Sequence, residues 1–102
     1  MVLRGEGGWV AIASFGDKAT EQLYHGGPTR FPANVVTVAR RKLDMLHAAH
    51  SLRDMASPPG NRLEALKGDL VGWFSIRVNR QWRIIFRWRD TDAYDVRLVD
   101  YH

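Results

Sequence analysis

Hydrophobic and polar residues alternate over three short stretches in the last third of the chain. Residues 73–78, 82–88 and 93–99 place apolar side chains at every second position, which is typical of strands with one buried face. Turn-forming residues separate these stretches at Asn79-Arg80 and at Asp90-Thr91-Asp92. We therefore expect an antiparallel meander of three strands.

The alternation also predicts which side chains face the core. The expected inward residues are aromatic or aliphatic: Phe74, Ile76, Val78, Trp82, Ile84, Phe86, Trp88, Tyr94, Val96 and Leu98. The same parity places Trp73, Ser75 and four arginines on the other face: Arg77, Arg83, Arg87 and Arg97. Because antiparallel sheets commonly leave one face in contact with water, we expect this second face to be open and basic.

The first half of the chain shows helical spacing after a loosely alternating segment, residues 9–15, that predicts a first strand. Asp17 is suited to cap a short helix that ends before Gly26-Gly27, and Pro32 is suited to the first turn of a second helix reaching about His50. The apolar stripe of the second helix comprises Val36, Ala39, Leu43, Leu46 and Ala49. Its opposite side is expected to carry Arg40, Arg41 and Lys42. The fold class is therefore α+β, with two N-terminal helices packed on one face of a small, mainly antiparallel sheet.

The length of 102 residues suits one domain over residues 1–102, in which the glycine-rich residues 1–8 are expected to be flexible. The absence of cysteine excludes disulfides, thiolate catalysis and cysteine zinc sites. The N-terminal apolar run is too short for a signal peptide or a membrane span. His47 and His50 lie three apart on a helix, but no carboxylate or cysteine completes a ligand set, so we expect no metal site. These features predict a soluble cytoplasmic protein.

The excess of positive charge is small over the whole chain but large within one segment. Fifteen Lys and Arg against eleven Asp and Glu leave a net charge of only +4. Residues 70–89, however, contain five arginines and no acid. Such a stripe favours contact with a polyanion such as RNA, although an acidic protein would suit it too.

The chain ends on Asp100-Tyr101-His102, a carboxylate, a phenol and an imidazole that can move protons. The unperturbed pKa of histidine, about 6.5, lets His102 give or take a proton near neutrality, although a terminal histidine can also be a frayed end. An arginine fork matches two phosphate oxygens, so Arg83 could hold a phosphodiester, or it could simply pair with Asp95 across the hairpin. Trp73 could stack on a base or belong to the protein's own packing.

Residues 58–102 closely resemble the HigB toxins of bacterial toxin–antitoxin pairs, a branch of the RelE superfamily. The motifs LKGD, SIRVN, WRIIFRW and the terminal VDYH carry the resemblance, in the order and spacing of that family. The segment SFGDKATEQLYHGG, residues 14–27, resembles the first strand and helix of the family more weakly. The resemblance implies a compact RelE-like domain.

The resemblance further implies a ribonuclease that enters the A site of the 70S ribosome and cleaves the mRNA being translated, without a metal or organic cofactor. The implied partner is a HigA-type helix-turn-helix antitoxin, and operator DNA would be contacted only through the antitoxin complex. Transferred by motif, Arg83 would steady the scissile phosphate, and Asp100, Tyr101 and His102 would form the catalytic cluster. The residues expected to bind RNA are Lys67, Arg77, Arg87 and Trp73.

Two positions depart from the pattern of the family. Some members carry a histidine two residues before the Leu-Lys-Gly-Asp motif, where this chain has Glu64. Either Glu64 acts as the general base, or the ribosome supplies that role. Leu70 and Val71 also stand where relatives often have basic or polar residues. The alternatives to a toxin are therefore a non-catalytic basic module that binds RNA or protein, and a degenerate toxin homologue.

Overall fold

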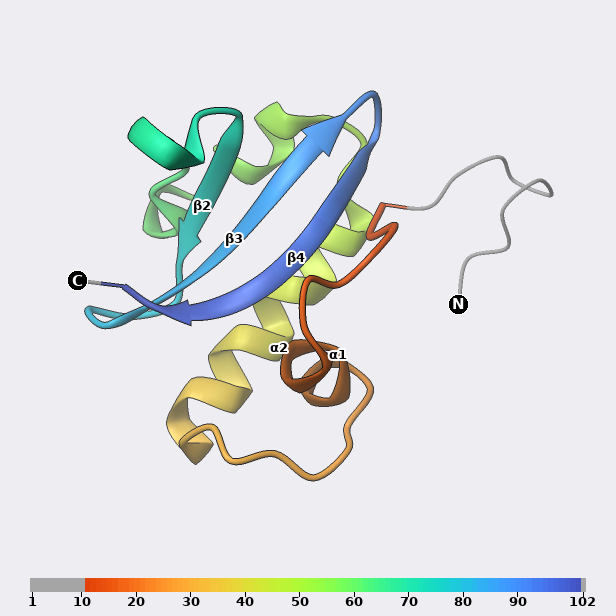
Figure 1. The fold of residues 1–102 in the computed structure, drawn as a ribbon, viewed down its shortest axis with the longest axis vertical. Helices are drawn as coiled ribbons and strands as arrows, with labels where there is room; N and C mark the ends of the chain where they lie inside the picture. Colours follow the sequence, from red (N-terminus) through yellow and green to blue (C-terminus); the bar gives the residue numbers. More distant parts are fainter. Residues whose placement is uncertain (1–10, 102) are drawn as a thin grey trace, which may run out of the picture.

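The computed structural model describes residues 11–101, which form two helices and a four-stranded antiparallel sheet (Figure 1). The helices are α1 (Lys18–Tyr24) and α2 (Ala33–Ala48), followed by two short 3-10 turns, η1 (Leu52–Met55) and η2 (Pro59–Asn61). The strands are β1 (Glu64–Ala65), β2 (Trp73–Arg77), β3 (Trp82–Arg89) and β4 (Asp92–Asp100), with a third 3-10 turn, η3 (Gly68–Leu70), between β1 and β2. The predicted α+β class is confirmed, with β1 added at the edge of the predicted meander in the order β1-β2-β3-β4. The expected flexible start, residues 1–8, and His102 lie outside the described residues.

The helices begin and end at the residues that the sequence indicates. The Asp17 carboxylate accepts a hydrogen bond of 2.7 Å from the Thr20 backbone N–H, which caps α1. Gly26, with φ +82°, adopts the left-handed conformation just after α1 ends. Pro32 stands at the N-cap of α2. Within residues 11–101, neither helix combines the length and apolar character that crossing a bilayer requires.

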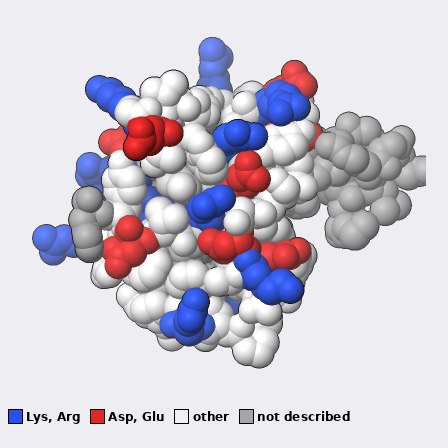
Figure 2. Space-filling model, viewed as in Figure 1, with Lys and Arg blue, Asp and Glu red and all other residues white. Residues whose placement is uncertain are grey.

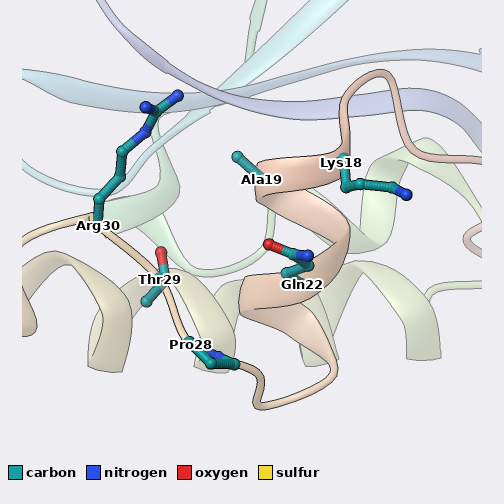
Figure 3. A pocket seen from close by; sticks show the side chains of 6 residues that line it. All are labelled: Lys18, Ala19, Gln22, Pro28, Thr29 and Arg30. Atoms are coloured by element: carbon teal, nitrogen blue, oxygen red, sulfur yellow. The ribbon is translucent and has the colours of Figure 1, made fainter.

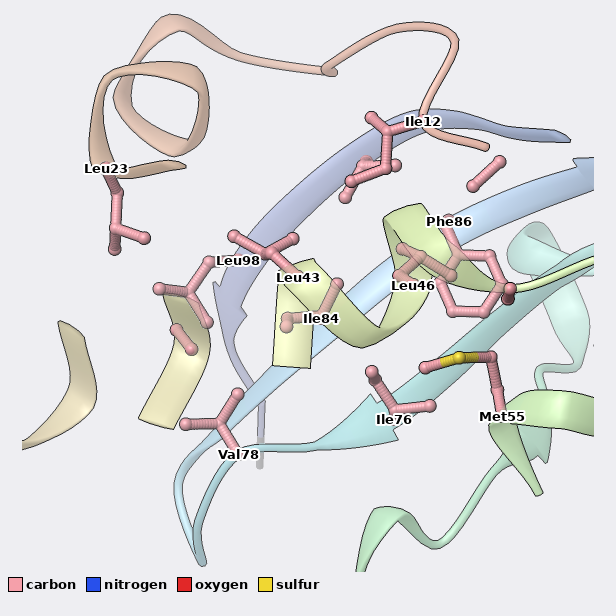
Figure 4. Close-up of a cluster of buried hydrophobic side chains, with 14 of the residues drawn as sticks. Ile12, Leu23, Leu43, Leu46, Met55, Ile76, Val78, Ile84, Phe86 and Leu98 are labelled. Atoms are coloured by element: carbon pink, nitrogen blue, oxygen red, sulfur yellow. The ribbon is translucent and has the colours of Figure 1, made fainter. Parts of the chain in front are cut away.

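The hydrophobic core lies between α2 and one face of the sheet (Figure 4). Its helical part contains Leu43 and Leu46, both fully buried, and its strand part contains Ile76, Ile84 and Phe86, which are also fully buried. In the view of Figure 1, α2 passes behind the sheet, so the opposite sheet face is turned toward the reader. That opposite face carries Arg83, and it is the face on which the candidate site lies.

The predicted first strand is present only as a short extension of the sheet. In its described part, Ile12 and Phe15 form isolated parallel bridges to Ala93 and Val96 of β4. Two backbone hydrogen bonds of 2.8 Å, from Ala13 N–H to the Ala93 carbonyl and from Gly16 N–H to the Val96 carbonyl, accompany them. The segment therefore covers the outer edge of β4, which would otherwise leave backbone groups unpaired.

A β-bulge interrupts the alternation in β4, and the prediction that Tyr94 faces the core is wrong. The register shifts by one residue opposite Ile85 and Arg87, and Asp95 has a positive φ of +54°. An extra residue in one strand reverses the facing of the residues beyond it. Ala93 consequently occupies the core, fully buried, while Tyr94 is partly exposed.

Lys42 also departs from the expected pattern. Arg41 is exposed as predicted, but Lys42 is only 7% exposed. Lys42 lies three residues after Ala39 and four before Leu46, so its side chain leaves the helix beside the apolar stripe. Its ammonium group donates hydrogen bonds to two backbone carbonyls, which allows the lysine to be buried.

Candidate active site

Arg83 lies on the sheet face opposite α2, and hydrogen bonds fix its side chain. Its Nε donates a 2.8 Å hydrogen bond to the Ser75 hydroxyl, and its Nη2 donates a 2.7 Å hydrogen bond to the Arg62 carbonyl. The Arg83 side chain lies on the predicted face but is only 11% exposed, which differs from the open position that the alternation predicted. The guanidinium is therefore fixed by the protein before any substrate arrives.

Glu64 and Tyr101 lie against the same guanidinium. Glu64 Oε1 is 3.6 Å from Arg83 Nη2, and the Tyr101 ring centroid is 5.7 Å from the Arg83 guanidinium carbon. The β1–β2 pairing places Glu64 directly across from Ser75, which carries the hydroxyl that holds Arg83. The Tyr101 N–H donates a 2.7 Å hydrogen bond to the Gln81 carbonyl, which ties the end of β4 to the β2–β3 turn. A carboxylate, a guanidinium and a phenol from three separate chain segments thus meet at one place.

A pocket of about 470 Å³ opens beside this cluster. Its lining residues come from β1, the segment after it and the chain end: Glu64, Ala65, Leu66, Lys67 and Tyr101. The structure therefore brings Lys67, one of the expected RNA-binding residues, to the same pocket as the Glu64 carboxylate.

The remaining candidates at this end of the sheet are close to Arg83 along the strands. Arg77 lies directly across from Arg83 in the β2–β3 pairing. The Asp100 carboxylate accepts a 2.9 Å hydrogen bond from Gln81 Nε2. His102 follows Tyr101 in the sequence and lies outside the described residues.

Trp73 and Arg87 lie in a second group at the other end of the face. The guanidinium carbons of Arg87 and Arg97 are 5.8 and 5.5 Å from the centroid of the Trp73 ring, and Arg87 Nε is 3.3 Å from Asp95 Oδ2. Arg87 is four residues from Arg83 along β3, a separation of about 13 Å. The four expected RNA-binding residues therefore divide between two places on the sheet, with Lys67 and Arg77 near the pocket. Asp95 therefore pairs with Arg87 and not with Arg83, the partner across the hairpin that the sequence also allows.

Comparison with known proteins decides the family. Residues 13–102 match the family model described as the RelE-like toxin of type II toxin–antitoxin system HigB. The chain belongs to the HigB toxin family. The match spans both helices, the whole sheet and every candidate residue of the site.

Individual members of the HigB family agree with this assignment. Toxin HigB-1 of Vibrio cholerae serotype O1 is 44% identical over 86 residues, which cover 82% of this chain and 90% of the relative. Endoribonuclease HigB of Proteus vulgaris is 34% identical over 92 residues, which cover 89% of this chain and 99% of the relative. The solved YoeB/ParE toxin from Agrobacterium tumefaciens superposes with a TM-score of 0.50 at 18% identity, covering 87% of this chain and 98% of that one. This structural similarity supports the RelE-like fold.

The surface of this HigB-family chain does not show the uniform basic stripe that the sequence predicts. Figure 2 shows positive and negative side chains interspersed on the sheet face. The acids come from outside the stripe, for example Glu64 beside Arg83 and Asp95 beside Arg87. An RNA would therefore meet separate positive positions rather than a continuous band.

Another pocket, of about 490 Å³, lies beside α1 (Figure 3). It is formed by α1 and the loop after it, and its lining residues are Lys18, Ala19, Gln22, Pro28, Thr29 and Arg30. It contains none of the predicted site residues. Within residues 11–101, no group of three His, Asp or Glu side chains gathers as metal ligands.

Sequence reasoning missed two groups that hold Arg83. Strand parity places Ser75 on the correct face but indicates no role for it. In the structure Ser75 is fully buried, and its hydroxyl accepts the 2.8 Å hydrogen bond from Arg83 Nε. The shared parity of β2 and β3 is the sequence feature that could have indicated this contact. No sequence feature indicates the Arg62 carbonyl, because its direction depends on the left-handed backbone of Arg62, with φ +47°.

Proposed function

We propose that this chain is a ribosome-dependent mRNA endonuclease that cleaves translated mRNA in the A site of the 70S ribosome. The observation that carries the proposal is that Glu64 and Tyr101 lie against the Arg83 guanidinium and line the pocket of about 470 Å³ beside it. The relative from Proteus vulgaris, which this chain covers almost entirely, is named an endoribonuclease. Family membership supports the same activity.

The proposed chemistry needs no group beyond the RNA and the protein. The 2′-hydroxyl oxygen attacks the adjacent phosphorus and forms the O2′–P bond, while its proton passes to a general base. The P–O5′ bond breaks, and the leaving 5′-oxygen receives a proton from a general acid. The products are a 2′,3′-cyclic phosphate and a 5′-hydroxyl. Each positioned acid or base contributes on the order of 10² to 10⁴-fold to the rate.

The residues near the pocket fit these roles. Glu64, whose side chain is 57% exposed and lines the pocket, is the proposed base, and His102 is the proposed acid. Arg83 is the proposed cation for the developing negative charge on the phosphorane oxygens. Because its guanidinium is already fixed, little reorganisation is needed during the reaction. Lys67 and Arg77 are proposed to hold the backbone of the RNA.

The partners follow from the same proposal. Toxin–antitoxin membership implies an antitoxin, and we propose that it is a HigA-type helix-turn-helix protein through which the complex reaches operator DNA. The substrate would be mRNA on the ribosome, which places the protein in the cytoplasm.

A non-catalytic or degenerate homologue is the second candidate, and the position of Glu64 favours it. Glu64 stands where some family members carry histidine, and it forms an ion pair with Arg83. A carboxylate there reduces the net positive charge available to a phosphate. This candidate predicts salt-sensitive RNA binding without cleavage.

The proposal is tested by inducing the toxin in bacterial cells and recording growth. We expect Arg83→Ala and deletion of His102 each to abolish growth arrest. Arg83 offers charge-assisted contacts of about 1.5–3 kcal/mol each, and a general acid contributes on the order of 10² to 10⁴-fold. Arg30→Ala is the matched control, because Arg30 is exposed in the loop after α1, does not line the pocket beside Arg83 and should leave the arrest intact. Circular dichroism must show that each variant is folded. A folded Arg83→Ala variant with full toxicity would contradict the role of Arg83.

A further inference from the structure

Lys42 is a buried charged residue for which the proposed chemistry has no use. It projects from α2, and its Nζ donates a 2.7 Å hydrogen bond to the Arg77 carbonyl and a 3.4 Å hydrogen bond to the Gly60 carbonyl. Burial, followed by the positive charges of Arg41, Arg77 and Arg83, lowers the pKa of Lys42 below its ordinary value. Placing an ammonium group among the apolar residues of α2 is costly, and an apolar side chain of similar length would fill the same space without that cost.

The two carbonyls that Lys42 binds belong to the two segments that hold Arg83. Arg77 lies directly across from Arg83 in the β2–β3 pairing. Gly60 lies in η2, two residues before Arg62, whose carbonyl accepts the 2.7 Å hydrogen bond from Arg83 Nη2. One ammonium group thus joins the strand beside Arg83 to the loop that binds its guanidinium.

The Gly60–Arg62 loop needs contacts that hold it, because the conformation that turns the Arg62 carbonyl toward Arg83 is an unusual one. Arg62 adopts a left-handed conformation, with φ +47°, and this conformation sets the direction of its carbonyl. Asn61, which is 1% exposed, anchors the loop on one side through a 3.0 Å hydrogen bond from Nδ2 to the Met55 carbonyl. Lys42 anchors it at Gly60 and links it to the sheet.

We infer that Lys42 is a positioning residue for Arg83, acting through the Gly60–Arg62 loop and the Arg77 carbonyl. Lys42 does not contact the pocket, so its effect on cleavage passes through the orientation of the guanidinium. The inference rests on the proposed function only where cleavage is the measurement. Misplacing a catalytic group by about 1 Å can reduce the rate on the order of 10²-fold.

The first test compares Lys42→Met with Arg41→Met in a purified translation system. Methionine retains the length and apolar stem of lysine but donates no hydrogen bond, and Arg41 is the exposed neighbour on the same helix. We expect Lys42→Met to reduce kcat on the order of 10- to 100-fold with little change in KM. Arg41→Met should leave both constants unchanged. A folded Lys42→Met variant with unchanged kcat would overturn the inference.

A double-mutant cycle separates positioning from a general loss of stability. In the residual single-turnover cleavage by the Arg83→Ala variant, Lys42→Met should cause no further loss, because the group that it positions is already absent. Its effect on the free energy of unfolding should persist in that background. Independent losses that multiply would mean that Lys42 does not act through Arg83. If Lys42→Met does not fold, Lys42→Gln, which keeps an N–H donor on a shorter side chain, takes its place in the cycle.

A spectroscopic measurement tests the inference even if the proposed function is wrong. The Arg83 Nε–H, hydrogen-bonded to Ser75, should give a distinct ¹H–¹⁵N resonance that Ser75→Ala alters. Lys42→Met should shift or broaden this resonance, and Arg41→Met should not. An unchanged resonance in Lys42→Met would overturn the inference. If Arg83→Ala cleaves mRNA like the wild type, the proposed function fails, while this measurement still decides the role of Lys42.

Discussion

Arg83 is the residue on which the proposed cleavage depends most directly. The Ser75 hydroxyl and the Arg62 carbonyl fix its guanidinium, and the Glu64 carboxylate lies 3.6 Å from its Nη2. Lys42 binds carbonyls of the two segments that hold this guanidinium. Single substitutions around Arg83 should therefore change cleavage while leaving the fold intact.

The proposed role of Glu64 as general base is tested by Glu64→Gln, which preserves its size and removes its ability to accept a proton. We expect cleavage to fall by about 10² to 10⁴-fold, because no carboxylate remains to take the proton of the 2′-hydroxyl. The measurement is single-turnover cleavage of ribosome-bound mRNA.

Glu21→Gln is the matched control for Glu64→Gln, since Glu21 is exposed on α1 and takes no part in the site. It should leave the rate unchanged. If Glu64→Gln cleaves at the wild-type rate, the base lies elsewhere, and a contribution from the ribosome becomes the leading explanation.

The strands β2 and β3 follow the predicted alternation. In β4 only the residues after the bulge follow it, with Val96 and Leu98 buried as predicted. Inward-facing Ile76, Ile84 and Phe86 are fully buried as expected, because a regular strand preserves its two-residue period. Asp95 breaks that period with a positive φ, and nothing in its residue type demanded this conformation. The alternation over residues 9–15 predicts a strand but not its partner, because pairing between distant segments is not encoded in a local pattern. In the structure, Ile12 and Phe15 of this segment form parallel bridges to β4.

Gly16 lies close against β4 and donates a backbone hydrogen bond of 2.8 Å to the Val96 carbonyl. A Cβ built on Gly16 would lie 2.8 Å from the Asp95 carbonyl oxygen and would collide with the guanidinium of Arg97. The Arg97 side chain can move, but the Asp95 backbone belongs to the bulge and the sheet. We therefore expect Gly16→Ala to reduce the free energy of unfolding by about 1–3 kcal/mol, measured by urea denaturation.

Gly60→Ala is the control for Gly16→Ala, because nothing lies within 4 Å of a Cβ built on Gly60. It should change the free energy of unfolding little. Equal stability of Gly16→Ala and the wild type would show that β4 and the N-terminal segment can separate at little cost.

The candidate site exists only in the folded chain, because its residues come from three distant segments. Glu64 and Lys67 lie around β1, Arg83 lies in β3, and Tyr101 follows β4. Periodicity predicted the helices and the sheet, but it could not predict that these segments converge. The resemblance to HigB toxins grouped most of the site residues without geometry, and the structure adds that Trp73 and Arg87 form a separate group. The candidate site is thus built around Arg83, and the hydrophobic core lies on the other face of the sheet.

The most direct test of the account is to map new 5′ ends on a reporter mRNA in a purified translation system. The wild-type chain and the His102 deletion are compared, each with and without ribosomes. We predict new ends inside the open reading frame only for the wild-type chain and only when ribosomes are present. Cleavage without ribosomes would contradict ribosome dependence, and no cleavage under any condition would contradict the proposed endonuclease itself.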